Sequence, residues 1–351
     1  MIISASYKTD IPTFYGEWFM NRLRAGYCRM VNPYGGQRYK VGLKREEVDG
    51  FVFWTKNIGP FLKYLPEVRE KGYPFIVQHS INGYPRELEA RVINYEQTVE
   101  HMHTLANEYG PDVAIWRYDP IVFSSLTPPY WHLDNFAKLA KALEGATNEV
   151  IISFAQIYRK TKRNMDDAAK EYGFDWYDHE TITQEQGKSF ALELFHQALK
   201  HGITLKVCSQ AAFLTPGVVE EARCVDAERL EKVAGKAIEA KLKGNRKECG
   251  CFESRDIGEY DTCPHGCVYC YAVQRRELAL QRFKEHNPDS PYLFPPKGVD
   301  LTEDEADEQM EQIQASQVIP LGTVGKRATT PIVSQLSMFD AMSSHREDDQ
   351  S

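Results

Sequence analysis

The chain has 351 residues, 42% apolar and 12% aromatic, which is enough for one large domain or two modest ones. No apolar run reaches the length of a membrane span, and the first residues lack the basic flank of a signal peptide, so we expect a soluble cytoplasmic protein. The net charge is −8, of which residues 297–351, with 11 acidic and 4 basic residues, account for −7. The near-neutral remainder does not exclude a nucleic-acid substrate, but it offers no broad basic face for one.

Segments typical of strands and helices alternate about six times through residues 1–248, as expected for repeated βα units. The expected strands are continuous apolar runs, which is typical of strands buried on both faces of a parallel sheet. They cover residues 2–6, 51–54, 75–79, 113–117, 150–154 and 204–207. The expected helices cover residues 14–23, 58–71, 87–109, 132–143, 183–201 and 216–242.

This alternation predicts an α/β fold, either an open doubly wound sheet or a (β/α) barrel, because βα crossovers are right-handed. In both arrangements, functional residues gather at the carboxyl ends of the strands. Polar residues follow successive strands at these ends: Lys56, Asn82, Arg117, Asp119, Gln156 and Cys208. Each one alone also fits an ordinary loop residue, and Arg117 with Asp119 also fits a buried ion pair. Their repetition favours a shared site.

The remaining segments are less regular. Residues 159–163 form a basic loop after the fifth strand, and residues 245–260 are loop-rich with a short strand expected at 256–260. A helix is expected at residues 273–286. We therefore divide the chain into βα repeats (1–248), a cysteine-rich segment (249–296) and an acidic tail (297–351). We expect the tail to be mostly disordered, with an acidic helix near residues 301–315.

Three cysteines, Cys263, Cys267 and Cys270, follow the spacing C-x3-C-x2-C, with Tyr269 before the last of them. One short loop can turn three thiolates toward a common centre. A [4Fe–4S] cluster held by three cysteines keeps one iron open for a small molecule. Structural zinc sites more often pair two C-x2-C knuckles or combine cysteine with histidine. The spacing therefore favours an iron–sulfur cluster, with zinc and free thiols as the alternatives.

A second set contains four cysteines: Cys208, Cys224, Cys249 and Cys251. Cys208 ends a strand on the side where the cysteine loop is expected, and Cys249 and Cys251 precede that loop closely. The set is a candidate for a second [4Fe–4S] cluster or a zinc ion, and the alternative is that Cys208 and Cys224 are small buried apolar residues. Cys28 is expected to be a buried thiol. His265 is expected to face solvent or to bond a cluster sulfur rather than to bind metal.

The cysteine loop and the strand ends resemble the radical S-adenosylmethionine (radical SAM) superfamily, in particular its spore photoproduct lyase or DNA repair photolyase-like branch. The similar stretches are Thr55-Lys56-Asn57, His79-Ser80-Ile81-Asn82, Arg117-Tyr118-Asp119-Pro120 and Cys267-Val268-Tyr269-Cys270-Tyr271-Ala272. In that superfamily the cysteine loop usually follows the first strand of a partial or full barrel, whereas here it follows about six βα units. The resemblance therefore implies a circularly permuted (β/α) barrel whose cluster-bearing unit is C-terminal.

Residues 1–296 are also similar to a bacterial family catalogued as a domain of unknown function. The stretches shared with it are Thr9-Asp10-Ile11-Pro12, Phe53-Trp54-Thr55-Lys56-Asn57 and Asp256-Ile257-Gly258-Glu259-Tyr260. The chain shows no clear match to the Gly-Gly-Glu strand that holds the SAM amino group in many radical SAM enzymes.

The radical SAM resemblance implies an enzyme, a lyase or a relative, that forms a 5′-deoxyadenosyl radical from SAM with electrons from a flavodoxin or ferredoxin. It implies catalytic roles for Lys56, Arg117 and Asp119. The residues implied to bind the cofactor are Tyr269, Ser80, Asn82 and Ser153. The implied substrate is DNA, in a repair reaction, and the alternative is a small molecule or peptide. A third interpretation is a non-catalytic zinc or iron–sulfur adaptor.

A short apolar motif lies in the polar tail. Residues Gln335, Leu336, Met338 and Phe339 resemble the peptide with which bacterial replication and repair proteins bind the DNA sliding clamp. The alternatives are a stray apolar cluster and a strap that folds back on the core. If the motif binds the clamp, the protein works on DNA, and the basic residues 159–163 would contact phosphates. The alternative for 159–163 is a solvated surface loop.

Overall fold

The structure is a computed structural model that describes residues 1–32, 35–244 and 248–296, all within the unit Met1–Lys297. The predictions for the tail, including the motif at Gln335, Leu336, Met338 and Phe339, lie outside the described residues. Within these ranges, no helix combines the length and the apolar character that a bilayer crossing requires.

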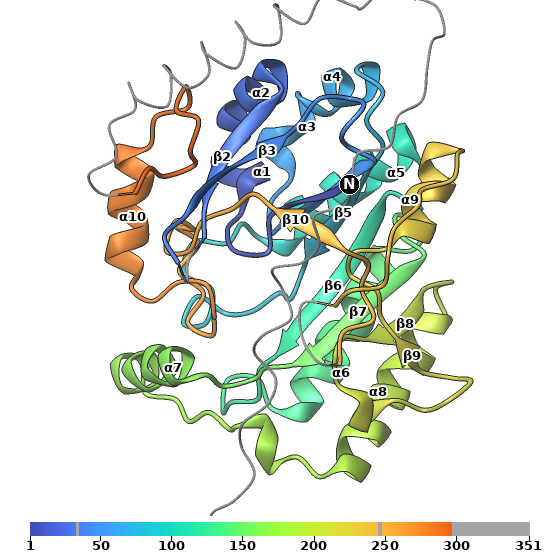
Figure 1. Ribbon diagram of the computed structural model, residues 1–351. Coiled ribbons are helices and arrows are strands. Elements are labelled where there is room, and N and C mark those ends of the chain that lie inside the picture. Colours follow the sequence, from blue (N-terminus) through green and yellow to red (C-terminus); the bar gives the residue numbers. More distant parts are fainter. Residues whose placement is uncertain (33–34, 245–247, 297–351) are drawn as a thin grey trace, which may run out of the picture. The chain divides into compact units, whose positions relative to one another are not determined.

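One parallel sheet organises the described chain (Figure 1). Its strands are β1 (Ile2–Ala5), β4 (Gly50–Thr55), β5 (Phe75–Ser80), β6 (Ala114–Ile121), β7 (Glu149–Phe154), β8 (Thr204–Val207), β9 (Glu220–Glu221) and β10 (Ser254–Asp256). Their order in space is β10-β1-β4-β5-β6-β7-β8-β9. The α/β prediction is therefore confirmed. The chain order is kept across the sheet except that β10 lies beside β1, with Ser254 opposite Ile2.

Helices connect the strands and flank the sheet (Figure 1). They are α1 (Ile11–Phe14), α2 (Gly16–Ala25), α3 (Gly59–Leu62), α4 (Leu65–Glu70), α5 (Tyr95–Tyr109), α6 (Pro129–Ala142), α7 (Arg159–Tyr172), α8 (Gln184–Leu199), α9 (Ala227–Ala234) and α10 (Arg276–Glu285). An antiparallel hairpin of β2 (Tyr27–Val31) and β3 (Arg38–Gly42) forms a separate small sheet.

Alternate residues of each strand enter different apolar clusters, because successive side chains of a strand point to opposite faces. On β4, Phe51 and Phe53 belong to the large cluster that contains residues of α2, α5, α6 and α8. Val52 between them belongs to a second cluster with Ile76, Ile115 and the segment that carries Cys224 and Cys251. Helices α2, α5, α6 and α8 thus cover one face. The other face, which we call the inner face, is covered by α9 and by loop residues that include Cys224 and Cys251. Burial of both faces explains the continuous apolar strands.

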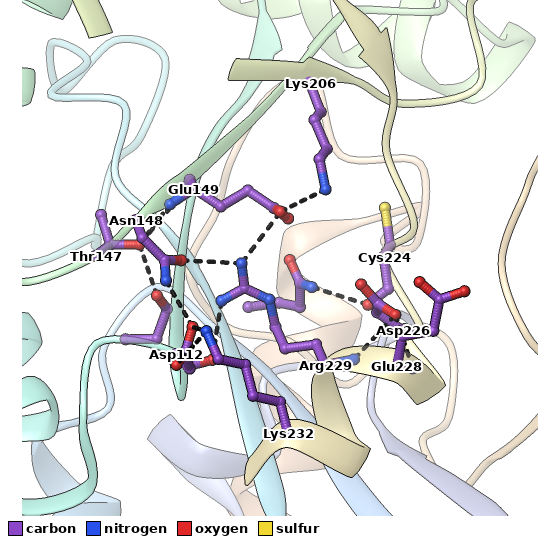
Figure 2. Close-up of polar contacts among 12 residues, drawn as sticks. Asp112, Thr147, Asn148, Glu149, Lys206, Cys224, Asp226, Glu228, Arg229 and Lys232 are labelled. Carbon is purple, nitrogen blue, oxygen red and sulfur yellow. Dashed lines mark hydrogen bonds and ion pairs between the residues drawn. The ribbon is translucent and has the colours of Figure 1, made fainter. Parts of the chain in front are cut away.

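A buried polar network fixes α9 at the amino-terminal ends of the strands (Figure 2). Arg229 of α9 donates to the carbonyl of Asp112 at 2.9 Å and to Asn148 Oδ1 at 3.0 Å. It also forms an ion pair at 3.1 Å with Glu149 Oε2, which lies 2.7 Å from Lys206 Nζ. The network therefore links α9 to β6, β7 and β8 near the amino-terminal ends of these strands.

Three predicted helices differ from those observed. Residues 87–94 are not helical, because the Asn94 side chain caps α5 by accepting from the N–H of Gln97. Residues 58–71 form two short helices, α3 and α4, instead of one. Most of residues 216–242 is also not helical: Asp226 caps the start of α9, and Gly235, in the left-handed conformation, ends it.

The basic residues 159–163 are the first turn of α7 and not a loop, so this prediction is wrong. Lys162 pairs with Asp166 one turn later at 2.7 Å, which supports the helix. Arg163 donates to the carbonyl of Gln274 beside the cysteine loop. Two of these basic side chains are thus engaged within the chain.

Two histidines are buried in the core. His132 Nδ1 lies 2.8 Å from the Tyr118 hydroxyl and Nε2 lies 3.0 Å from the Val122 carbonyl, an arrangement that suits the neutral ring. Burial lowers the pKa of His79 to about 3 and that of His132 to about 4. Both rings therefore stay neutral in the folded chain near pH 6.

We expect Arg229→Met to lower the free energy of unfolding by about 3 kcal/mol, because it leaves the buried carboxylate of Glu149 with one partner fewer. The matched control is Lys232→Met, whose side chain pairs with Asp112 but is 65% exposed. Its loss should stay below about 1 kcal/mol. Urea unfolding at pH 7 measures both, and equal losses in the two variants would contradict the structure.

The buried histidines also predict acid sensitivity. Their pKa values are lowered in the folded state, so below pH 6.5 the unfolded chain takes up protons that the folded chain does not. Stability should be complete above about pH 6.5 and fall by about 1.4 kcal/mol per pH unit per histidine toward pH 4. His79→Gln and His132→Gln should each reduce this slope in urea unfolding series, whereas the exposed His196→Gln should not. Unchanged slopes in both core variants would refute the prediction.

Candidate functional site

The carboxyl ends of β4 and β5 bring Lys56 and Asn82 to one carboxylate, that of Glu89. Lys56 Nζ lies 2.7 Å from Glu89 Oε1, and Asn82 Nδ2 donates to the same oxygen at 3.3 Å. The Tyr269 hydroxyl from the cysteine loop also bonds Glu89 and accepts from Asn82 Nδ2 at 3.2 Å. Predicted residues from two strand ends and from the cysteine loop thus share one acidic centre.

Glu89 is a site residue that the sequence analysis does not predict. The sequence places residues 87–109 in a helix, whereas Glu89 lies in the loop before α5. The residue is only 4% exposed. Burial disfavours a charged Lys56, but the Glu89 carboxylate and then Cys267 outweigh this effect, and the pKa of Lys56 is raised. The only signal in the sequence is indirect, since a lysine at a buried strand end requires an acidic partner.

Arg117 and Asp119, both within β6, form an ion pair, as the alternative interpretation predicts. Asp119 also accepts from the Ser153 hydroxyl of β7, and its backbone N–H donates to Asn82 Oδ1 at 3.0 Å. Burial disfavours the charged guanidinium, but Asp119 outweighs it and raises the pKa of Arg117. Asn82 therefore joins the Arg117 pair to the Glu89 centre.

Two other strand-end residues lie at the border of this network. Ser80 lines a cavity of about 280 Å³ together with Asn82 and Glu89. Gln156 accepts from the hydroxyl of Tyr158 at 2.9 Å near the surface. The structure thus groups Ser80 with the site and gives Gln156 a surface contact.

Cys263, Cys267 and Cys270 all line one cavity of about 470 Å³. Backbone N–H groups face their sulfurs: that of His265 bonds Cys263, and that of Ala272 lies 3.4 Å from Cys270 Sγ. Burial raises the pKa of each of the three thiols. Nearby negative groups add to this at Cys263 and Cys267, whereas backbone N–H groups and nearby lysines oppose it at Cys270. A positive centre in the cavity would reverse this effect, because it stabilises thiolates.

His265 is buried, so the first of the two alternatives expected for it, a side chain that faces solvent, is wrong. Its Nε2 lies 2.7 Å from Asp10 Oδ2, and the same carboxylate accepts the N–H groups of Lys56 at 2.8 Å and Thr13 at 2.9 Å. Burial alone would raise the pKa of Asp10, but His265 and these N–H groups outweigh it, and the pKa is lowered. His265 Nδ1 is buried without a hydrogen-bond partner among the described residues. The histidine anchors the cysteine loop to the start of α1.

The second cysteine set also comes together. Cys208 Sγ lies 3.2 Å from Cys224 Sγ, and Cys251 bonds the side chains of both Cys224 and Cys249. The bond from Cys208 lowers the pKa of Cys224, but Cys251 and burial outweigh it and raise the pKa to about 11. Cys28 is fully buried in the hairpin, as predicted.

The chain matches a family described as a domain of unknown function (DUF1848) over residues 2–272. The chain belongs to this family. The match extends through the cysteine loop of the DUF1848 chain. No curated protein and no solved structure matches the chain.

The DUF1848 cysteine loop can be tested for its fit to a cluster. In the described ranges, no group of three or more His, Cys, Asp or Glu side chains is arranged around a single-ion position. A four-iron cluster requires a different arrangement, because each thiolate binds a different iron and the sulfurs stand farther apart. One cavity bordered by three cysteines, with N–H groups facing two of their sulfurs, fits this requirement.

We expect Glu89→Gln to lower the free energy of unfolding by about 3 kcal/mol, because it leaves the Lys56 ammonium buried without its anion. The pKa of Lys56 should fall, so its amine should react faster with an acylating reagent at pH 9, as quantified by mass spectrometry. The exposed Glu100→Gln on α5 is the control and should change neither quantity. Unaltered Lys56 reactivity in Glu89→Gln would show that the ion pair does not control this amine.

Proposed function

We propose that this chain is a radical SAM enzyme in which Cys263, Cys267 and Cys270 hold a [4Fe–4S] cluster. The observation that carries the proposal is that all three cysteines line one cavity, with backbone N–H groups directed at the sulfurs of Cys263 and Cys270. Hydrogen bonds to sulfur and burial are the features with which proteins tune such clusters. A fourth cysteine is not needed, because the iron without a protein ligand is the one that takes SAM.

We infer further that the sheet is the permuted barrel of this superfamily. The strand that precedes the cysteine loop, β10, pairs in parallel with β1, and the spatial order then continues through β4, β5, β6 and β7. The strand before the cysteine loop is thus the edge strand beside β1, although it is the last strand in the chain. This order supports the permutation that the sequence resemblance implies.

The residues around Glu89 and Asp119 have distinct roles in the proposal. Ser80, Asn82 and Ser153 present polar groups to SAM from the ends of β5 and β7, and Tyr269 keeps Glu89 in place. Lys56, Arg117 and Asp119 orient the substrate, and their burial helps to exclude water. When bound, the cluster would supply one electron, taken from a flavodoxin- or ferredoxin-type donor, and this electron would cleave SAM to methionine and a 5′-deoxyadenosyl radical.

The charges beside the cysteine loop favour a small molecule or peptide over a DNA duplex as the substrate. The cavity that the three cysteines line has no excess of positive charge around it. It is bordered by equal numbers of basic and acidic residues: Arg86, Arg163, Arg275, Arg276, Glu87, Asp167, Glu171 and Glu277. A phosphate backbone would favour an excess of positive charge. Salt-sensitive DNA binding by the full chain would support the DNA alternative.

Anaerobic reconstitution with iron and sulfide tests the proposal. We expect a brown protein with about four irons and four sulfides at this loop, and release of 5′-deoxyadenosine from SAM on reduction. Cys263→Ala should lose this activity, whereas Cys28→Ala, which removes a buried thiol of the hairpin, should keep it. Wild-type protein that takes up no iron, or that holds only zinc and leaves SAM intact, would overturn the proposal and favour the adaptor interpretation.

A further inference from the structure

A second cluster of thiols lies away from the cysteine loop, on the inner face of the sheet. We call Cys208, Cys224, Cys249 and Cys251 the cysteine quartet. We infer that the cysteine quartet binds one tetrahedral divalent ion of the zinc type, and that this ion joins the segments that flank the two outer strands of the sheet. The inference is independent of the proposed radical chemistry.

The quartet is a continuous group of sulfur contacts. Cys208 Sγ and Cys224 Sγ are 3.2 Å apart, and Cys251 bonds the side chains of its neighbours Cys224 and Cys249. Cys224 and Cys251 are buried, at 4% and 2% exposed. Cys208 and Cys249 are partly exposed. Four thiols gathered in this way have little reason to meet for packing alone, and soft divalent ions prefer thiolate ligands.

Two sulfurs of the quartet, those of Cys224 and Cys251, accept hydrogen bonds that would stabilise thiolates in a metal site. Cys251 Sγ accepts the backbone N–H groups of Cys224 at 3.2 Å and Val225 at 3.4 Å. Arg117 Nη1 donates to Cys224 Sγ at 3.0 Å. N–H donors and a cation beside sulfur stabilise negative charge, and a zinc ion with four thiolates carries a net charge of about −2 that needs such partners.

The sulfur spacing favours a single ion over a second cluster. Zinc–sulfur bonds of about 2.3 Å place tetrahedral thiolates about 3.8 Å apart, close to the contact that Cys208 and Cys224 already make. A four-iron cluster would have to separate these sulfurs, because each thiolate binds a different iron. Among the described residues, the four side chains as they stand do not surround a single-ion position. Closing them into a tetrahedron therefore requires Cys208 and Cys249, the less buried members, to turn toward Cys224 and Cys251.

The positions of the four residues give the ion a structural role. Cys208 directly follows β8, Cys224 follows β9, and Cys249 and Cys251 precede β10. The backbone already links these segments, since the N–H of Phe252 donates to the Val225 carbonyl at 3.0 Å. The ion would strengthen this link between the segment after β9 and the segment before β10, the strands at the two edges of the sheet.

Cys224 is held in place before any metal arrives. Gln78 on β5 donates to its backbone carbonyl at 2.8 Å. Two residues later, Asp226 caps α9, which Arg229 fixes to Glu149 and Asn148 (Figure 2). This anchoring pre-organises one ligand and orients Arg117 toward it. A disulfide between Cys208 and Cys224 is the competing explanation for their contact, but it would give Cys249 and Cys251 no role.

The test uses the full chain purified without chelators and analysed for zinc and iron. Wild type should hold about one zinc ion per chain in the quartet. The variant with Cys263, Cys267 and Cys270 all changed to Ala should keep this zinc. The Cys249→Ser, Cys251→Ser variant should lose zinc affinity by more than about 100-fold and keep the iron of the cysteine loop.

Substitution with Co²⁺ gives a readout that needs no variant. The wild type should develop the absorption bands of tetrahedral thiolate-bound Co²⁺, and Zn²⁺ should abolish them. Three results would overturn the inference: no tightly bound metal with all quartet thiols titratable, iron and sulfide that persist in the Cys263, Cys267 and Cys270 variant, or a Cys208–Cys224 disulfide in freshly purified protein. Absence of iron in the wild type would instead overturn the proposed function.

Discussion

The pairing of β10 with β1 is the interaction on which the rest of the site depends. It joins the first strand to one that begins 252 residues later, and the buried carboxylate of Asp256 secures it. Asp256 accepts from the hydroxyls of Ser4 at 3.0 Å and Ser6 at 2.9 Å and from the N–H of Tyr7 at 3.0 Å. A buried carboxylate is tolerated only with such partners, so this arrangement fixes both strand ends at once.

This constraint explains how a cysteine loop late in the chain reaches the carboxyl ends of earlier strands. The loop begins just after β10, and residues near the N-terminus hold it. The Tyr15 hydroxyl donates to the Thr262 carbonyl at 2.5 Å, and Asp10 pairs with His265. Since Asp10 also accepts the N–H of Lys56, one carboxylate sets the cysteine loop against the end of β4.

Much of the fold follows from the sequence because parallel strands buried on both faces leave a continuous apolar signal. The predicted strand 204–207 agrees with β8, and the other central strands differ from their predictions by a few residues at most. Capping groups are harder to predict. Asn94 begins α5 and Asp226 begins α9 well inside segments whose apolar period suggests longer helices.

The site, like the fold, contains some residues that the sequence predicts and others that it does not. Strand position predicts that Lys56, Asn82 and Asp119 meet, because carboxyl ends of parallel strands share one edge. Glu89 and Asp10 cannot be predicted this way, since they lie in a loop and at a helix start and reach their partners through tertiary contacts alone. The sequence spacing of Cys249 and Cys251 suggests a ligand pair, but only the fold brings Cys224 to them.

The two cysteine sets have similar charged neighbours. Each lies beside one buried cation, Lys56 near Cys267 and Arg117 against Cys224, and each cation is already paired with a carboxylate, Glu89 or Asp119. These cations therefore cannot alone compensate several thiolates in a low-dielectric interior. A metal centre at each set, as proposed above, would supply the missing positive charge, while the existing ion pairs fix the orientation of the surrounding groups. Because Asn82 bonds both Glu89 and the Asp119 backbone, a change of charge at one cysteine set would reach the other through these shared partners.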